Sequence, residues 1–353
     1  MQFSQTVLNS PSKDLGAIGQ VKTIRKWRPS LLQERVGEVA QRTAEQEAAG
    51  ISWPQLQEAR EKYVEWEAFA LWVRAIEEAE GDVPQWLAKI VDKRCRGFLK
   101  FAEDGKRDQS DSLPFVWRCL ERWVNERNFS KAWWQGWMNA VGYYAGRDLT
   151  SLRNHAYWEY CERLWKRSKP AAYPAFRDWL RASERSCDRA LDECEMPEEK
   201  RRLLKLSRRV GPQTLRKAVE RYVEWEVFAY WARTALEARS TLPASVEREV
   251  RQRCPGFLEA EAAARAANPK EELHCPFNRM IKWIEDNEFA DAQNRGWFDV
   301  LRYQARFHPR HIRIIDYWHD WEAGRAKQPA ARHPSFIQWR DAADRYTFEP
   351  DES

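Results

Sequence analysis

The longest amphipathic segment of the chain runs from residue 53 to residue 80. Its apolar residues recur at i, i+3 and i+4 on one side, and further aromatic and aliphatic residues occupy the other side. This pattern predicts a helix that is buried nearly all round. Ser52 with Gln55 three residues later forms a capping-box pattern, and Gly81 is suited to end the helix. The helix is expected to be about 40 Å long.

The centre of this segment occurs twice. Residues 63–72, Tyr-Val-Glu-Trp-Glu-Ala-Phe-Ala-Leu-Trp, return at 222–231 as Tyr-Val-Glu-Trp-Glu-Val-Phe-Ala-Tyr-Trp, displaced by 159 positions. Further matches follow in the same order, such as residues 94–99 with 253–258. The sequence therefore predicts an internal duplication with tryptophan-rich cores. Six tryptophan pairs are kept in both copies: Trp66 and Trp225, Trp72 and Trp231, Trp123 and Trp283, Trp137 and Trp297, Trp158 and Trp318, and Trp179 and Trp339.

The remaining pattern is also helical, and no segment has the alternation of β-branched and polar residues that indicates a strand. The predicted fold class is therefore all-α, with two tandem copies of a multi-helix unit in solenoid-like or bundle packing. A polar loop is expected at 105–113, and a further helix opens at residues 97–99. The other helices are expected at roughly 30–49, 85–95, 114–127, 131–145, 151–167, 174–194 and 198–209.

The helix at 198–209 would correspond to the one at 30–49, so the boundary between the copies is expected near residue 195. This predicts a flexible N-terminal arm at 1–29, a first repeat unit at 30–195, a second at 196–348 and a disordered tail at 349–353.

Composition narrows the function classes only slightly. The net charge of +5 and the pI of about 8.7 are too mild to indicate nucleic-acid binding by themselves. No apolar run is long enough to span a membrane, and the N-terminus has no apolar signal core, so a cytoplasmic protein with no membrane partner is expected. The seven cysteines include no CxxC motif and are expected to be reduced and mostly buried.

Two glutamates in the repeated segment, Glu65 and Glu67, are a candidate catalytic pair and are repeated as Glu224 and Glu226. Residues i and i+2 on a helix point about 200° apart, so they cannot hold one substrate atom together. The favoured interpretation is that each carboxylate pairs with an arginine or caps a neighbouring helix.

Metal-site spacings occur at Glu271 with His274 and at Asp316 with His319. A di-iron bundle needs two such motifs and two further glutamates on facing helices, so no metal site is predicted. GxSxG and the glycine-rich phosphate loops are absent, and no cofactor is predicted.

The copies differ at two adjacent tryptophans. Trp133 and Trp134 match Gln293 and Asn294, so the tryptophan pair is predicted to face outward. The alternative is that the pair packs against the other half or against the N-terminal arm, because tryptophan is usually well buried.

Basic residues accompany this difference. Arg163, Lys166 and Arg167 form an i, i+3, i+4 stripe that the second half lacks at two of three positions. The helix at 198–209 is also basic, with a solvated connector as the alternative interpretation. Its candidate binding residues are Arg201, Arg202, Lys205, Arg208 and Arg209.

These features favour a non-catalytic scaffold or adaptor subunit that binds a protein partner through an arginine- and tryptophan-rich face of the first half. The first alternative is nucleic-acid or nucleoprotein binding through the same surface and the basic helix, because stacking and phosphate contacts use the same residue types. The second is an enzyme of unknown class with a site in the helical core.

Overall fold

The computed structural model describes most of the chain outside the N-terminal segment and five other short stretches. In the described residues every regular element is a helix and no strand occurs, which confirms the all-α prediction. The predicted arm at 1–29 and tail at 349–353 lie outside the described residues. The described residues are Ala40, 43–44, 47–48, 50–108, 116–239, 242–267, 276–327 and 332–346.

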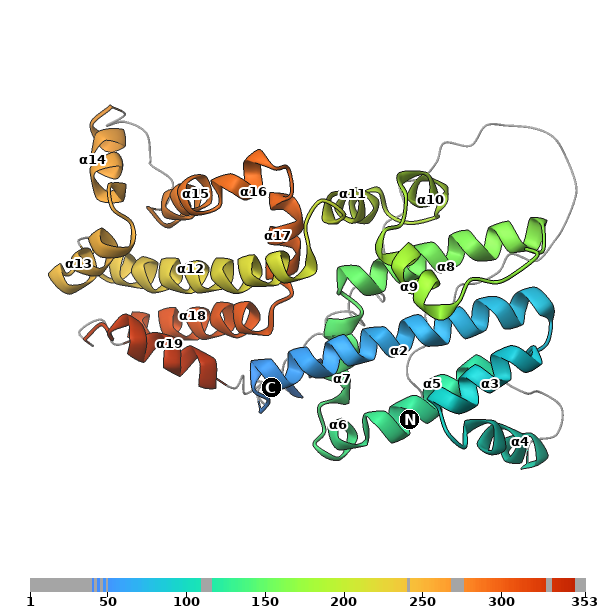
Figure 1. The fold of residues 1–353 in the computed structure, drawn as a ribbon. Helices are drawn as coiled ribbons and strands as arrows, with labels where there is room; N and C mark the ends of the chain where they lie inside the picture. The colour runs from blue at the N-terminus through green and yellow to red at the C-terminus, as the bar shows by residue number, and fades with distance from the viewer. Residues whose placement is uncertain are drawn as a thin grey trace, which may run out of the picture. The chain divides into compact units, whose positions relative to one another are not determined.

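Two long helices organise the described residues. α2 (Trp53–Glu80) and α12 (Pro212–Arg239) each contain 28 residues, and Figure 1 shows each of them running along its own group of shorter helices. The predicted bounds of α2 are confirmed. Gly81 follows in the left-handed conformation with φ of 76°, which glycine adopts without a Cβ penalty, and its N–H bonds to the Glu77 carbonyl.

The predicted capping box at the start of α2 is wrong in its hydrogen bonds. Ser52 is the N-cap residue, but its hydroxyl accepts no backbone N–H. It donates instead to the Gln55 side-chain oxygen at 2.8 Å, and Pro54 supplies no N–H to that first turn.

The helices around α2 and α12 recur with nearly the same lengths in the same order. Around α2 they are α3 (Gln85–Arg94), α4 (Phe98–Asp108), α5 (Val116–Asn128), α6 (Ser130–Trp134), α7 (Met138–Ala145), α8 (Leu149–Arg167) and α9 (Phe176–Glu184). Around α12 they are α13 (Ala244–Arg253), α14 (Phe257–Ala267), α15 (Pro276–Glu288), α16 (Ala290–Asn294), α17 (Phe298–Arg306), α18 (Pro309–Lys327) and α19 (Phe336–Arg345). Between the groups lie α10 (Asp188–Glu193) and α11 (Glu198–Ser207).

Three expected segments differ from the structure. The helix expected at 131–145 is divided, because Gly136 adopts a φ of +70° between α6 and α7. The helix expected at 174–194 ends at Glu184, where the hydroxyls of Ser183 and Ser186 bond back to backbone carbonyls of the last turn. The loop expected at 105–113 is helical as far as Asp108, and its remaining residues lie outside the described residues.

Tryptophan fills both cores. Eight of the twelve paired tryptophans are buried and the other four are partly buried, which confirms the prediction of low exposure for most of them. The indole N–H of Trp72 donates to the Pro174 carbonyl at 3.1 Å, and that of Trp231 donates to Pro334 at 3.0 Å. Each long helix therefore holds the loop before its last neighbouring helix by the same bond.

Side chains also cross between the two helix groups. Ile312 of α18 packs into a small cluster with Val141 and Tyr144 of α7. Conversely, Leu149 and Ala156 of α8 belong to the core built around α12.

Candidate functional site

The predicted tryptophan pair lies on the five-residue helix α6. Phe129 and Ala132 are buried on either side of the helix start, and Gly136 ends the turn that follows. Trp133 is 43% exposed and Trp134 is 90% exposed. The Trp134 indole therefore lies almost wholly in solvent, which is unusual for the largest apolar side chain.

The basic stripe of α8 is not brought together with this pair. Phe129, next to α6, packs against Tyr63 near the middle of α2, whereas Lys169, just after α8, pairs with Glu80 at its end. Seventeen residues of helix separate Tyr63 from Glu80, or about 25 Å. Figure 1 shows α6 and the end of α8 at different places along α2. The composite aromatic and basic surface expected from the sequence is therefore two separate surfaces.

Within the stripe the three residues have different surroundings. Arg163 is partly buried, and its Nε donates to the Glu159 carbonyl at 3.4 Å. Lys166 pairs with Glu162 on the same helix, and Arg167 is exposed.

The basic residues of α11 are mostly engaged by acids. Arg201 donates to the Cys194 carbonyl at 2.9 Å and pairs with Glu198. The three other ion pairs are Arg202 with Asp299, Lys205 with Asp192, and Arg208 with Asp188. These contacts join α11 to α10 and α17, so the basic side chains of α11 contribute to packing between helices. Arg209 is exposed and lies beside Gly296.

A second exposed apolar group was missed by sequence reasoning. Trp86 and Ile90 are one turn apart on α3 and are 40% and 38% exposed. The Trp86 ring stacks on Tyr173, with centroids 6.3 Å apart, and Tyr173 in turn packs edge-on against Trp165 of α8 at 4.9 Å. We call these four residues the α3 patch. A signal was present, because the corresponding positions in the second half are polar, as they are for Trp133 and Trp134.

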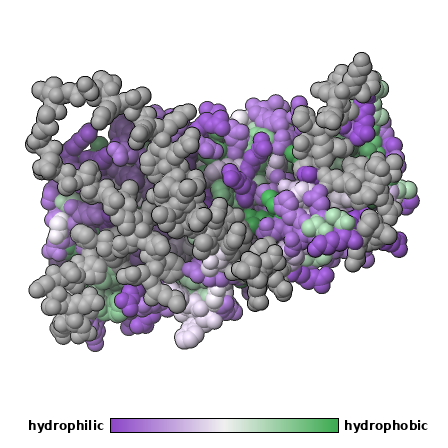
Figure 2. Space-filling model, turned by 180° about the vertical axis from the view of Figure 1, so that it is seen from behind, coloured by the Kyte–Doolittle hydropathy of each residue, from purple (hydrophilic) through white to green (hydrophobic). Residues whose placement is uncertain are grey.

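The surface around these exposed apolar side chains is mainly polar. Among the described residues, the face in Figure 2 is mainly hydrophilic, with hydrophobic residues in small groups. In the part of the chain whose burial is described, six large apolar side chains are exposed. They are Trp86, Ile90, Trp133, Trp134, Leu164 and Ile337.

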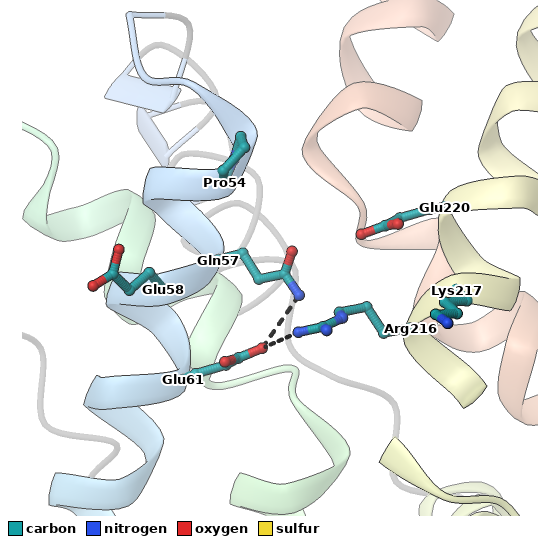
Figure 3. A pocket seen from close by; sticks show the side chains of 7 residues that line it. All are labelled: Pro54, Gln57, Glu58, Glu61, Arg216, Lys217 and Glu220. Atoms are coloured by element: carbon teal, nitrogen blue, oxygen red, sulfur yellow. Dashed lines mark hydrogen bonds and ion pairs between the residues drawn. The ribbon is translucent and has the colours of Figure 1, made fainter. Parts of the chain in front are cut away.

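A polar cleft of about 350 Å³ lies between α2 and α12 (Figure 3). Glu61 accepts hydrogen bonds from Gln57 at 3.2 Å and from Arg216 at 3.1 Å, so the groups that point across the cleft satisfy one another. Glu58, Lys217 and Glu220 line the rest. An exposed ion pair between Glu61 and Arg216 thus bridges the cleft. Exposed pairs of this kind contribute about 0–1 kcal/mol to the free energy of unfolding.

The repeated glutamates behave as structural groups. Glu65 is exposed and pairs with Arg94, and Glu224 pairs with Arg310 at 2.9 Å. Glu67 is partly buried, and burial raises its pKa to about 7 although the Ser151 hydroxyl donates to it at 3.0 Å. Glu226 pairs with His311 at 2.8 Å. The two members of each pair therefore face different surroundings, as the i, i+2 geometry requires.

His308 is the most deeply buried imidazole of the described chain. Burial lowers its pKa well below the usual value, and nearby arginines act in the same direction. Its Nδ1 accepts the Arg310 N–H at 3.2 Å, and its ring lies 4.0 Å from that of Trp53. The neutral ring thus packs between the start of α2, at Trp53, and the start of α18.

The described residues contain no group of three or more histidine, cysteine or acidic side chains placed to hold a metal ion. The Glu271 and His274 spacing lies outside the described residues, and His319 is exposed. Cys95 and Cys254 are fully buried, as predicted, and burial raises the pKa of the Cys95 thiol to about 11 and that of Cys254 to about 12. Across the helices that the structure describes, none is apolar over a membrane-spanning length.

Comparison with models of known protein families, with curated proteins and with solved structures found no match.

Proposed function

We propose that this chain is a non-catalytic helical scaffold or adaptor that binds a protein partner through its first half. One observation carries the proposal. Five of the six large apolar side chains that are exposed in the described residues precede residue 195, and Ile337 alone follows it. Large exposed apolar and aromatic side chains of this kind mark protein interfaces.

The proposal includes two copies of one multi-helix unit, at 30–195 and 196–348. The recurring helix lengths support it, and so do equivalent long-range bonds. Arg153 donates to the Glu184 carbonyl at 2.9 Å, and Arg313 donates to the Asp344 carbonyl at 3.1 Å, from the same position of α8 and α18.

The copies are proposed to pack reciprocally, as the subunits of a two-fold dimer do. Ile312 of α18 enters a cluster with α7, while Leu152 of α8 packs against the core around α12. These two residues occupy the same position of their helices. Reciprocal packing closes on itself, which favours a paired bundle over an open solenoid.

The binding surface is centred on Trp134, with Trp133 beside it. The helix α16 has the same five residues of length and the same buried alanine, yet it carries Gln293 and Asn294 at these positions. The local fold therefore forms without tryptophan there. An exposed tryptophan that the fold does not need is suited to enter a pocket of a partner, where tryptophan is enriched among the residues that dominate binding energy.

Binding of nucleic acid remains the alternative function, but no observation favours it at α11. The side chains of Arg202, Lys205 and Arg208 are engaged by aspartates of the same chain. A phosphate group would have to displace these partners.

The test places a photo-crosslinking amino acid at position 134 of the full chain, and at position 294 as the matched control. We expect one protein to be cross-linked from position 134 and not from 294, and its co-purification to fall at least tenfold in Trp133→Ala/Trp134→Ala. Two results would overturn the proposal: a nucleic-acid adduct in place of a protein, or a sharp loss of thermal stability in the double variant, which would place the pair in packing.

A further inference from the structure

The α3 patch is a surface that the first half has and the second half lacks. Trp86 is the second residue of α3, and Ser245 is the second residue of α13; Ile90 corresponds in the same way to Glu249. Tyr173 precedes Pro174 as His333 precedes Pro334, and Trp165 of α8 corresponds to Arg325 of α18. Both helices contain 10 residues, so the helix itself does not require apolar groups at these positions.

The patch is held in place before any partner arrives. Trp86 stacks on Tyr173 and also meets the buried Trp72 edge-on, with centroids 6.1 Å apart. Tyr173 is fixed in turn by its hydroxyl, which donates to Glu80, and by the Trp165 ring. A pre-organised aromatic surface loses little conformational entropy on binding.

Two lysines flank the exposed edge of the patch. Lys89 follows Trp86 by three residues, and Lys93 follows Ile90 by three. At 3.6 residues per turn these four side chains fall within an arc of about 100° on α3. Both lysines are exposed, and within the described residues neither forms an ion pair. Two acids of α2 near the patch are already engaged, Glu80 by Lys169 and Tyr173 and Glu65 by Arg94.

From this arrangement we propose that the α3 patch docks an acidic amphipathic helix of a partner protein. The apolar side of that helix covers Trp86 and Ile90, and its carboxylates meet Lys89 and Lys93. Charge complementarity selects this occupant, because the surface combines an apolar centre with two lysines that form no ion pair within the described residues. An aliphatic side chain at position 90 suits leucine-like contacts better than stacked bases, since base recognition uses aromatic faces.

This surface is independent of the Trp134 surface. α6 is joined to α5, whereas the α3 patch lies where α3 meets the loop after α8. An adaptor needs two docking surfaces, and the second remains even if Trp133 and Trp134 prove to be packing residues. Variants on α3 and on α6 therefore report on the two proposals separately.

The first experiment selects peptides from a random 16-residue display library against the full chain. Trp86→Ser/Ile90→Glu serves as the counter-selection target, since it copies the second half and is expected to fold. We expect enriched peptides that are acidic and carry at least two large apolar residues at helical spacing. No enrichment over the counter-selected variant, or enrichment of neutral or basic peptides, would overturn the proposal.

The second experiment measures the affinity of one enriched peptide by fluorescence anisotropy. Trp86→Ser/Ile90→Glu and Lys89→Glu/Lys93→Glu are each expected to weaken binding at least tenfold, while Ile337→Ser on α19, which is exposed but distant in the chain, leaves it unchanged. A peptide with its acids replaced by lysine should bind Lys89→Glu/Lys93→Glu better than it binds wild type.

Three results would contradict the charge and occupant assignments. The first is no rescue by the charge-reversed peptide. The second is displacement of the peptide by a single-stranded oligonucleotide, which would indicate a nucleic-acid surface. The third is dimerisation of the full chain that Trp86→Ser/Ile90→Glu abolishes, which would make a second copy the occupant.

Discussion

The buried carboxylate of Glu67 accepts a hydrogen bond from the Ser151 hydroxyl at 3.0 Å. At the equivalent place around α12, Glu226 meets His311 at 2.8 Å instead. The carboxylate on α2 thus meets a neutral donor, whereas the one on α12 meets a titratable imidazole. From this difference we expect the two cores to respond differently to pH.

The first prediction concerns Glu67→Gln. Burial raises the pKa of Glu67 to about 7, above its usual value of 4.5. A carboxyl whose folded pKa is raised binds a proton more readily in the folded state, so the free energy of unfolding falls as pH rises from the unfolded pKa to the folded one. Glutamine cannot ionise, and we expect the variant to match wild type near pH 4.5 and to exceed it by about 1–3 kcal/mol at pH 8.

Urea unfolding at a series of pH values checks this expectation, with Glu58→Gln in the exposed cleft as the control. A stability difference between Glu67→Gln and wild type that does not grow with pH would contradict this expectation.

The second prediction concerns His311→Ser, which copies Ser151. Burial alone lowers the pKa of His311, but the hydrogen bond and the charge of Glu226 outweigh burial and raise it above the usual 6.5. A raised histidine pKa gives stability that is complete below the unfolded pKa and is lost as pH rises through the folded pKa. The variant should therefore lose more stability at pH 6 than at pH 8.5.

Thermal or urea unfolding of wild type and variant at both pH values measures this difference. An equal loss at the two pH values would show that His311 acts only by packing and not by its charge.

The third prediction concerns thiol reactivity. Burial raises the pKa of Cys95 to about 11 and that of Cys254 to about 12, and neither side chain reaches solvent. Cys187, at the start of α10, is exposed. Because the thiolate is the reactive form, we expect Cys187 to react with Ellman's reagent within minutes at pH 8, while Cys95 and Cys254 react only after unfolding.

Comparison of wild type with Cys187→Ser, in native buffer and in guanidinium, assigns the fast phase. Modification of Cys95 in the native protein at the rate of Cys187 would mean that the first core opens readily.

Local signals predicted the helices where they were strong and failed where they were weak. The bounds of α2 match the predicted ones because its apolar pattern ends at Gly81. Glycine readily adopts the left-handed conformation that ends a helix, so the residue type itself signals the end. The break at Gly136 has a similar signal in the glycine itself, which recurs at Gly296 with φ of +71°. The break after Glu184 has no glycine or proline. It depends on serine hydroxyls that bond to the backbone, which residue types alone do not reveal.

The exposed candidate surfaces were also only partly predictable from the sequence. Comparison of the halves identified Trp133 and Trp134 as positions that packing does not require, and the same comparison would have identified Trp86. It could not show that the stripe of Arg163, Lys166 and Arg167 lies far from the tryptophan pair, because distance along the sequence does not give distance in the fold. The contact of Trp86 with Tyr173 joins residues 87 positions apart (86 to 173), and only the tertiary fold creates it.

The last prediction contrasts two tryptophans of the first half. Trp179 has no exposed surface and packs against Tyr157 within the α2 core, whereas Trp134 is 90% exposed. Replacing a buried tryptophan by alanine removes a large apolar contact and leaves a cavity, so Trp179→Ala should cost about 3–5 kcal/mol. Trp134→Ala removes little packing and should change stability by less than about 0.5 kcal/mol.

Trp339→Ala is the matched control, since Trp339 is equally buried in the second half and packs against Tyr317. Urea unfolding of the three variants gives the comparison, and we expect Trp179→Ala and Trp339→Ala to lose similar amounts. A stability loss for Trp134→Ala as large as theirs would mean that its ring is covered in solution. The α6 surface would then be a packing contact of the fold and would have no partner to bind.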